Sequence, residues 1–444
     1  MDERAGVTVH RDGAGTRPDP SRMFRLPWTA ADNAMTWLEP TRKCNITCDA
    51  CFAQNDPRSQ KPLGRIQMEL EAMLRLRRCD AMLIAGGEPL THPDIAAIVR
   101  MVRRAGVKPV IVTNGVALDG ALLAELRAAG VHGFTFHVDS HQQRPGWIGA
   151  TEPALNALRS HLAGMVHEAG GLVCGFNTTI FPDALRYVPD VVTWALARPE
   201  QVQVLTLICV RGVAAGGPFR FVAGGRDVDL GATPYASEAA LGHLTAEELY
   251  REIRRALPDF EFCAFLGGTA LPDSLKWTVG LVLNSGWRSY GVAGARTMEL
   301  VQNAHHFFRG RYLAYGPPRA NRLGKLALLL GLVDPVLRRA ARRWLGTALR
   351  HPAELLRPLH LQSISVVQPV DILPNGEMDS CDGCPNRTYF EGRLVAACRL
   401  DEYQRYGAPV GAVPRDRGAE PQRVGAVPLR PDAEQRAPVG DPAS

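Results

Sequence analysis

A regular alternation of two patterns from Trp37 onward constrains the fold of this chain more than any other feature. Short apolar runs of strand length alternate with longer segments in which apolar residues recur every three or four positions, as on one face of a helix. A strand–helix–strand order with short connections predicts a parallel sheet with right-handed crossovers, hence an α/β fold. Six such strands fit either a partial (β/α) barrel or an open, doubly wound sheet. Strands are predicted at residues 37–39, 81–85, 109–113, 133–138, 172–177 and 202–210, and helices at 68–77, 93–105, 120–129, 153–168 and 184–197.

Changes in composition divide the 444 residues into five segments. Residues 1–36 are rich in Gly, Pro and Asp and are predicted to form a flexible arm. Residues 37–212 hold the alternating core, and residues 213–368 are predicted to be mainly helical because the alternation is lost there. Residues 369–405 form a cysteine-rich unit, and the proline-rich residues 406–444 are expected to be disordered because they have too little apolar surface to bury.

Charge and hydropathy exclude several classes of protein. The chain has 51 Lys and Arg against 45 Asp and Glu, and this net charge of +6 does not call for a nucleic-acid partner. No run of about 18 apolar residues is present, and the first residues lack the apolar core of a signal peptide, so a cytoplasmic protein is expected. Cysteines there stay reduced, which makes clustered ones better candidates for metal ligands than for disulfides.

An apolar and basic stretch interrupts the mainly helical segment. Residues 326–333 are an apolar run, and five arginines follow Pro335 over the next 15 residues. Such a stretch is typical of a segment that makes peripheral contact with a membrane or binds an anionic, apolar substrate. A core helix whose arginines face water is the simpler interpretation.

Three cysteines follow the first predicted strand. Cys44, Cys48 and Cys51 occur in KCNITCDACF, with three and two residues between them. A structural zinc site needs four ligands, and neither Cys79 nor His92 lies at zinc-finger spacing. A 4Fe-4S cluster with only three protein thiolates leaves one iron open, which is what a chelating substrate requires.

A second motif follows the second predicted strand, where LIAGGEPL contains Gly86, Gly87, Glu88 and Pro89. Together the two motifs resemble the radical S-adenosylmethionine (SAM) superfamily. The resemblance covers about residues 37–212 and implies a partial (β/α)6 TIM-type barrel. It also implies a catalytic 4Fe-4S cluster on the three cysteines and SAM bound to the open iron. SAM is then cleaved reductively to methionine and a 5′-deoxyadenosyl radical, with electrons from a flavodoxin- or ferredoxin-type donor.

The resemblance also implies roles for residues in the loops after the strands, which all leave the carboxyl-terminal face of such a barrel. The GGEP loop is expected to support the methionine amino group. Many members carry an aromatic residue that contacts adenine at the position where this chain has Ala50. Phe52 is expected to make this contact instead. Asp139 and Ser140 are expected to bind the ribose, unless they cap a helix. Asn177 is expected to bind the carboxylate or ribose. Asn114, before Gly115, is either a further SAM contact or part of a turn.

A second cysteine group lies near the carboxyl end. Cys381, Cys384 and Cys398 follow Gly376 in a pattern that resembles part of a SPASM or twitch auxiliary-cluster extension. These extensions usually have another cysteine shortly before the glycine, whereas here none lies between Cys263 and Cys381. Cys263, a non-cysteine group or the substrate then supplies the fourth ligand. Zinc in a small ribbon and a reduced, metal-free group are the alternatives.

Other chemically active residues have two interpretations each. Cys174 and Cys209 lie in predicted strands, where they either pack in the core or point into the barrel and donate a hydrogen atom to a radical. Four further side chains either orient an acidic group of the substrate or have only a structural role. They are His137, His141, Arg144 and Arg211.

These observations predict a radical SAM enzyme that modifies an organic substrate. The stretches EPTRKCNITCDAC, IAGGEPLTHPDI and FNTTIF are most similar to the subgroup that includes adenosyl-hopene transferases, which implies a lipid or isoprenoid substrate. A peptide-modifying maturase is the first alternative, because auxiliary clusters often accompany peptide modification. A non-catalytic iron-sulfur or zinc electron-transfer protein is the second, although an electron carrier has no use for the GGEP loop.

Overall fold

The computed structural model describes residues 17–415 apart from 54, 211–212, 215–218, 231–235, 238–242 and 287. Arg211 and the predictions for residues 1–16 and 416–444 lie outside the described residues.

Six parallel strands lie side by side in chain order and form the centre of the main sheet. Their positions match the six apolar runs of the sequence to within a few residues. The largest difference is at the fifth, which continues three residues beyond Asn177. The strands are β2 (Met35–Thr41), β3 (Ala81–Gly86), β4 (Lys108–Thr113), β5 (Gly133–His137), β6 (Val173–Ile180) and β7 (Val204–Cys209).

The crossover helices also lie where the periodicity predicts them. Local signals set their ends: the Asp119 carboxylate accepts a hydrogen bond from the Leu122 N–H at the start of α3, and Gly130 ends it with φ of 92°. The helices are α1 (Leu63–Leu76), α2 (Ile95–Arg104), α3 (Gly120–Ala129), α4 (Glu152–Ala169) and α5 (Val188–Leu196).

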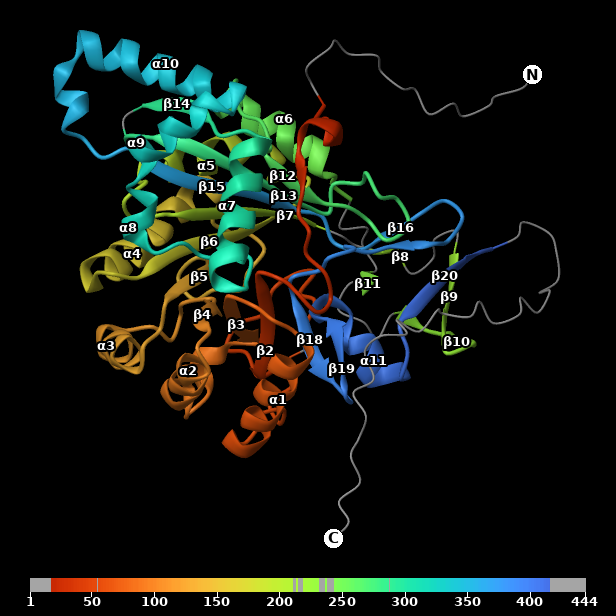
Figure 1. Cartoon of the computed structure of the whole chain (residues 1–444). Coiled ribbons are helices and arrows are strands. Elements are labelled where there is room, and N and C mark those ends of the chain that lie inside the picture. The colour runs from red at the N-terminus through yellow and green to blue at the C-terminus, as the bar shows by residue number, and fades with distance from the viewer. Residues whose placement is uncertain are drawn as a thin grey trace, which may run out of the picture.

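Two separate apolar clusters show that the sheet curves into a partial barrel. Residues from all five crossover helices, such as Ile66 and Val99, belong to one cluster on the outer face. The inner cluster contains Trp37 and Leu83 from one side of the sheet together with Leu266 from the other. Among the described residues no side chain of α1–α5 belongs to this inner cluster, so the doubly wound alternative is wrong. The mixed α/β fold with a parallel sheet is confirmed (Figure 1).

The segment that follows the core contains strands of the main sheet as well as helices, which the prediction of a mainly helical region at residues 213–368 did not include. It continues the main sheet beyond β7, because β15 pairs parallel with β7 and β13 pairs antiparallel with β15. Short apolar runs such as those in these strands cannot be assigned to strand or helix by periodicity alone. The added strands are β12 (Ala264–Leu266), β13 (Trp277–Asn284), β14 (Ser289–Val292) and β15 (His360–Val367).

The helices of this segment surround the added strands. They are α6 (Ala246–Ala256), α7 (Ala295–Arg309), α8 (Pro318–Asn321), α9 (Gly324–Ala327) and α10 (Pro335–Arg350). The turn at Ala314 and Tyr315 lies at the amino-terminal ends of the barrel strands. Lys108 Nζ donates a hydrogen bond to the Ala314 carbonyl at 2.8 Å, and the Tyr315 hydroxyl lies 3.3 Å from Thr135 Oγ1. This turn therefore covers the end of the barrel opposite the cysteine loop.

The described part of the amino-terminal arm is packed, which corrects the prediction that residues 1–36 are flexible. β1 (Phe24–Arg25) pairs with β12 at the edge of the main sheet, and Leu26 and Trp28 are buried in the inner cluster. The sequence contains Phe24, Leu26 and Trp28 in this arm, but it gives no sign of the strand with which the arm pairs.

The carboxyl-terminal unit consists of short paired strands and one helix. β18 (Arg387–Phe390) and β19 (Arg393–Ala396) form a hairpin, and α11 (Leu400–Tyr406) follows Cys398. Disorder from residue 406 is wrong for the described part, because β20 (Val410–Pro414) pairs with β9 (Phe219–Ala223). The remaining short strands are β8 (Val213–Ala214), β10 (Arg226–Val228), β11 (Ala236–Ser237), β16 (Asp371–Ile372) and β17 (Met378–Asp379). None of the helices described has both the length and the apolar character of a membrane-spanning segment.

One fully buried ion pair supports the loop after β5. Arg159 on α4 pairs with Glu152, whose carboxylate also accepts a hydrogen bond from the Ser140 N–H at 2.6 Å. Arg159 donates a further hydrogen bond to the Val138 carbonyl at 2.9 Å. This pair therefore fixes the main chain of the loop that carries Asp139 and Ser140.

We expect Arg159→Met to lower the free energy of unfolding by about 3–5 kcal/mol, because it leaves the Glu152 carboxylate buried without its cation. Urea denaturation followed by circular dichroism measures the change. Arg255→Met is the matched control, since Arg255 pairs with Glu252 at 2.8 Å but is 68% exposed, and should change stability by less than about 1 kcal/mol. Equal losses in the two variants would contradict this account.

Candidate functional site

The first cysteine group lies on the loop that leaves the carboxyl end of β2. Cys48 forms an antiparallel bridge with Gln142 on the loop after β5. Two main-chain hydrogen bonds flank the bridge, from the Asp49 N–H to the His141 carbonyl at 3.0 Å and from the Gln143 N–H to the Thr47 carbonyl at 2.7 Å. The cysteine loop is thereby held across the mouth of the barrel.

Backbone strain lies within this loop. Ala50, between Cys48 and Cys51, has φ of 52°, in the left-handed region that non-glycine residues rarely adopt. Strain of this kind persists where surrounding contacts impose it, and it occurs often at functional sites. The departure of Ala50 from the family pattern therefore coincides with an unusual backbone conformation.

The three thiols of the first cysteine group are candidate ligands for a cluster. None of them is in a disulfide, and each is partly buried. Burial raises the pKa of all three, so a positively charged partner is needed to keep them as thiolates. Within the described part of the chain no three His, Cys, Asp or Glu side chains are arranged around one ion. In a 4Fe-4S cluster each thiolate binds a different iron, so the three sulfurs need not converge on one atom.

The GGEP loop packs against the base of the cysteine loop. A Cβ atom at Gly87 would lie 2.4 Å from the Lys43 carbonyl oxygen, and Gly86 has φ of 116°. The Gly87 and Glu88 N–H groups donate hydrogen bonds to Thr41 and Lys43 carbonyls at 2.9 and 2.8 Å. Only glycine allows this approach, which explains the two glycines at these positions.

The Glu88 side chain is fully buried and bonded within the protein. Its carboxylate accepts hydrogen bonds from the Thr113 hydroxyl at 2.6 Å, the Asn114 N–H at 2.7 Å and the Leu90 N–H at 2.9 Å. Desolvation raises its pKa. Glu88 therefore joins the loops after β3 and β4, and Pro89 begins a 3-10 turn beside it.

Asn114 connects the loop after β4 to the first cysteine. Its side-chain nitrogen lies 2.7 Å from Asn45 Oδ1 and 3.8 Å from Cys44 Sγ. The turn interpretation is also correct, because Gly115 has φ of 75° and the Asn114 side chain accepts a hydrogen bond from the Val116 N–H. Asn114 thus forms part of a turn and also contacts the cysteine loop, and its contact with SAM stays a prediction.

Arg144 is a buried cation beside this group. It donates hydrogen bonds to the carbonyls of Asn114 and His137 and to Gln142 Oε1, all of them neutral acceptors, while its Nε has no partner. Desolvation lowers its pKa, and the neighbouring Cys48 and Asp139 oppose this. A buried guanidinium with neutral partners is suited to an anionic ligand.

The loop after β5 places Asp139 and its neighbours beside the cysteines. The Asp139 carboxylate lies 3.0 Å from His137 Nε2 and accepts a hydrogen bond from the His141 N–H. His141 stacks on Phe181 and contacts Asp49 of the cysteine loop at 3.0 Å. Thr151, not Asp139 or Ser140, occupies the cap position of α4, so the capping alternative for these two residues is wrong.

A row of polar side chains crosses four strands on the inner face of the sheet. His137, Asn177, Thr206 and Ser365 are directly paired across β5, β6, β7 and β15. Asn177 therefore lies within β6 rather than at its end. Thr206 and Ser365 were missed in the sequence, where a single hydroxyl within an apolar strand gives the only signal. Paired residues share one face, so the row forms a wall of hydrogen-bonding groups.

Phe52 and the strand cysteines lie on opposite faces of the sheet. Phe52 belongs to the inner cluster, where its ring contacts Trp37 edge-on at 5.7 Å. Cys174 and Cys209 belong to the outer cluster with the helices. They therefore pack in the core, and the hydrogen-donor alternative is wrong for both.

The second cysteine group lies between the edge of the main sheet and the amino-terminal arm. Cys381 forms a bridge with Gly268, and a Cβ atom at Gly383 would lie 2.4 Å from the Trp28 carbonyl oxygen. Cys381, Cys384 and Cys398 are partly buried and interact electrostatically. A hydrogen bond from the Cys381 thiol, aided by the Arg387 and Arg77 guanidiniums, lowers the pKa of Cys384.

Arg77 is the main residue of this group that the sequence did not reveal. It is 1% exposed, and all its hydrogen bonds go to main-chain carbonyls, including those of Cys384 and Pro385 at 3.2 and 3.1 Å. Desolvation and the nearby Arg387 lower its pKa to about 10. The predicted partner Cys263 instead bonds through its thiol to the Val279 carbonyl at 3.2 Å, within the sheet.

Arg42 connects the two cysteine groups. It lies two residues before Cys44 and forms ion pairs with Glu39 and with Asp401 at the start of α11. A further hydrogen bond joins it to Gln404 at 2.5 Å. The loop that carries the first group is thus fixed to the helix that follows the second.

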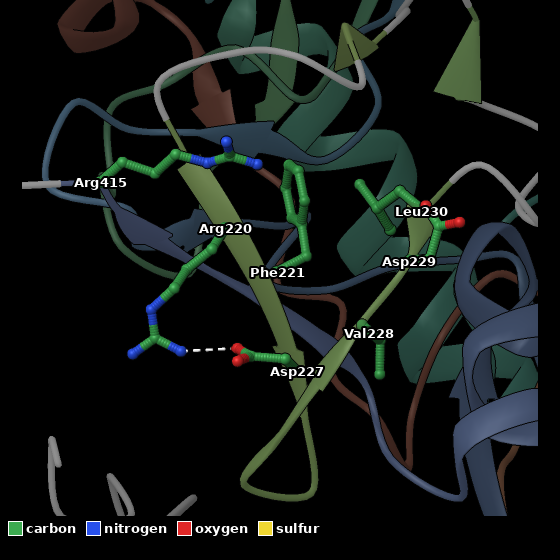
Figure 2. Close-up of a pocket in the computed structure, with 7 residues that line it drawn as sticks. All are labelled: Arg220, Phe221, Asp227, Val228, Asp229, Leu230 and Arg415. Carbon is green, nitrogen blue, oxygen red and sulfur yellow. Dashed lines mark hydrogen bonds and ion pairs between the residues drawn. The ribbon is translucent and has the colours of Figure 1, made fainter. Parts of the chain in front are cut away.

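A pocket away from these residues lies on the β9–β10–β20 sheet (Figure 2). Arg220 and Asp227 form an ion pair of 2.6 Å at its edge, and Arg415 lines the other side. None of the predicted site residues lines it.

Comparisons with known proteins agree with this geometry. Residues 38–182 match the sequence model of the Radical SAM superfamily. The AdoMet-dependent heme synthase of Methanosarcina barkeri is 31% identical over 140 residues, which cover 29% of this chain and 39% of the relative. The S-adenosylmethionine-dependent nucleotide dehydratase of Selenomonas ruminantium is 40% identical over 78 residues, 18% of this chain and 28% of the relative.

Among solved structures, Streptococcus suis SuiB bound to S-adenosylmethionine superposes with a TM-score of 0.34 and 16% identity, over 41% of this chain and 42% of that chain. The chain spans well under half the length of the two curated relatives named above. Residues 38–182 of this chain are thus similar to the Radical SAM superfamily.

Proposed function

We propose that this protein is a radical SAM enzyme in which Cys44, Cys48 and Cys51 hold a 4Fe-4S cluster with one iron left for SAM. The observation that supports this most directly is the contact between the cysteine and GGEP loops. Because Gly86 and Gly87 lack side chains, the two loops share main-chain hydrogen bonds. A ligand on the open iron would lie beside both.

When bound, the cluster supplies the low-potential electron that cleaves the carbon–sulfur bond of SAM to methionine and a 5′-deoxyadenosyl radical. The residues of this chain bind and orient. In this proposal Arg144 provides a buried positive charge for the SAM carboxylate, and the Asp139 carboxylate accepts hydrogen bonds from the ribose hydroxyls. Since Glu88 is used to position Asn114, contact with the methionine amino group falls to main-chain atoms of the GGEP loop.

We further propose that Cys381, Cys384 and Cys398 hold an auxiliary iron-sulfur cluster. Arg77 supports an anionic occupant, because a buried guanidinium with only carbonyl partners gains most from a nearby negative charge. A non-cysteine group or the substrate supplies the fourth ligand, since Cys263 is bonded elsewhere. A zinc ion held by the three thiolates is the alternative, and metal analysis separates the two.

The substrate proposed for this site is a lipid or isoprenoid. The similarity of three core stretches to the adenosyl-hopene-transferase subgroup supports this, and the polar row offers neutral hydrogen bonds to a hydroxyl-bearing end of such a molecule. A peptide substrate is the rival. Mass spectrometry of products from reconstituted protein, SAM and each candidate substrate separates the two, with a flavodoxin or ferredoxin as electron donor.

We expect Cys48→Ala to lower the iron content from about eight to about four atoms per chain and to abolish 5′-deoxyadenosine formation under reducing conditions, because the catalytic cluster loses a ligand. Iron analysis and chromatography of the products measure both. Cys174→Ala is the control and should retain both, since Cys174 packs in the outer core. Continued SAM cleavage by Cys48→Ala would refute the proposed function.

We expect Cys384→Ser to remove about four irons while leaving SAM cleavage without substrate detectable, because only the auxiliary cluster is lost. Loss of one zinc atom per chain instead would identify the second group as a zinc site. Cys79→Ala, a buried core residue, is the control.

We expect Asn114→Ala to make the reduction potential of the first cluster more negative by on the order of tens of millivolts, because a donor to the Cys44 sulfur is lost. Redox titration followed by electron paramagnetic resonance measures this shift. Asn375→Ala, on an exposed turn, should leave the potential unchanged. A potential unaffected by Asn114→Ala would show that this amide does not reach the cluster.

A further inference from the structure

The exposed apolar side chains of this protein are concentrated in one segment. Of the 15 large apolar residues described as exposed, nine lie between residues 323 and 356. Leu332 is 82% exposed, Leu349 76% and Leu356 89%. Scattered single residues of this kind are ordinary, but a contiguous set indicates an interaction surface.

These residues lie on one face of a helical hairpin. Leu326, Leu329 and Leu332 recur every third position through α9 and the following 3-10 helix. They therefore form one stripe along the first arm of the hairpin. On α10, Leu345 and Leu349 lie one turn apart. Two arginines lie on the same side of α10 at spacings of three or four residues. The second stripe therefore consists of Arg338, Arg342, Leu345 and Leu349.

Contacts within the hairpin bring the two stripes together. Arg338 donates hydrogen bonds to the carbonyls of Gly331 and Leu332, both at 2.8 Å. At the other end Lys325 Nζ bonds to the Leu355 carbonyl at 2.6 Å. The stripes therefore run antiparallel and adjacent, and we call residues 323–356 the leucine face. α10 lies at the periphery of the molecule (Figure 1).

The segment that carries this face is strongly basic. Residues 318–357 contain nine Lys and Arg against Asp334 and Glu354, which gives +7, whereas the whole chain carries +6. The other residues together thus carry −1. Asp334 and Glu354 are both 1% exposed, because Asp334 caps α10 and Glu354 bonds to Tyr290. Within residues 318–357, the exposed charged side chains are therefore all basic.

We propose that the leucine face docks this protein peripherally onto an anionic lipid bilayer. The apolar side chains would enter the boundary between headgroups and acyl chains, while the basic residues contact anionic headgroups. The proposal requires neither cluster and does not depend on the SAM chemistry.

Charge argues against a second copy of this chain as the occupant. A two-fold interface would place the basic residues of both copies against each other, and residues 318–357 themselves offer no exposed acidic partner. The acidic residues nearest to α10, Asp259 and Glu261, lie on the side of Arg343 and Arg339, away from the leucine stripe. An anionic surface satisfies both the charge and the apolar area.

The test is flotation of the purified full-length chain with lipid vesicles. We expect binding to vesicles of phosphatidylcholine with one third phosphatidylglycerol, weaker binding to phosphatidylcholine alone, and weaker binding at high salt. A Leu329→Ser, Leu332→Ser, Leu349→Ser triple variant should lower the partition coefficient at least about a hundredfold, since each leucine gains on the order of tenfold from burial. Arg342→Gln with Arg350→Gln should lower it about twentyfold on anionic vesicles only.

Phe307→Ser is the matched control, because Phe307 is 81% exposed near the end of α7, whereas Asp334 contacts the opposite end of this helix. It should bind as the unaltered protein does, and all variants should keep the same thermal midpoint. The proposal fails if the unaltered protein does not float with anionic vesicles, or if Phe307→Ser loses as much binding as the triple variant. It also fails if the triple variant keeps vesicle binding and instead converts a dimer to a monomer.

Discussion

The close approach of two loops at the mouth of the barrel is the constraint on which the site depends. The absence of side chains at Gly86 and Gly87 lets the main chain after β3 contact the main chain that leads into the first cysteine. Glu88 then fixes the next loop through the Thr113 hydroxyl and the Asn114 N–H. A larger residue at either glycine would separate all three loops. The positions of the thiols thus follow from backbone contacts rather than from contacts between thiols.

Much of this core could be predicted from sequence because the relevant signals are local. Strand and helix patterns, helix caps and the two motifs each lie within a few residues, and the six parallel strands lie where these patterns indicate. Domain boundaries and the roles of individual site residues stay predictions. The extension of the sheet by β13 and β15 could not be seen, since pairing between residues far apart leaves no periodic signal that separates a strand from a helix.

The same reason explains the residues that were missed. Thr206 and Ser365 become functional candidates only because the register aligns them with His137 and Asn177. In the sequence nothing distinguishes Arg77 from other residues at helix ends. It is buried against the second cysteine group by segments more than 300 positions away. Sequence reasoning identified the cysteines and Arg144 beside the first group, but not Arg77 beside the second.

The packing of the amino-terminal arm has a consequence for how the second cysteine group is protected. The Trp28 main chain contacts Gly383, and Asn33 Nδ2 donates a hydrogen bond to the Gly383 carbonyl at 3.1 Å. These residues therefore serve as a cover for the turn between Cys381 and Cys384. A chain shortened to start at the first core strand would expose that turn to oxidants, even though every cysteine would still be present.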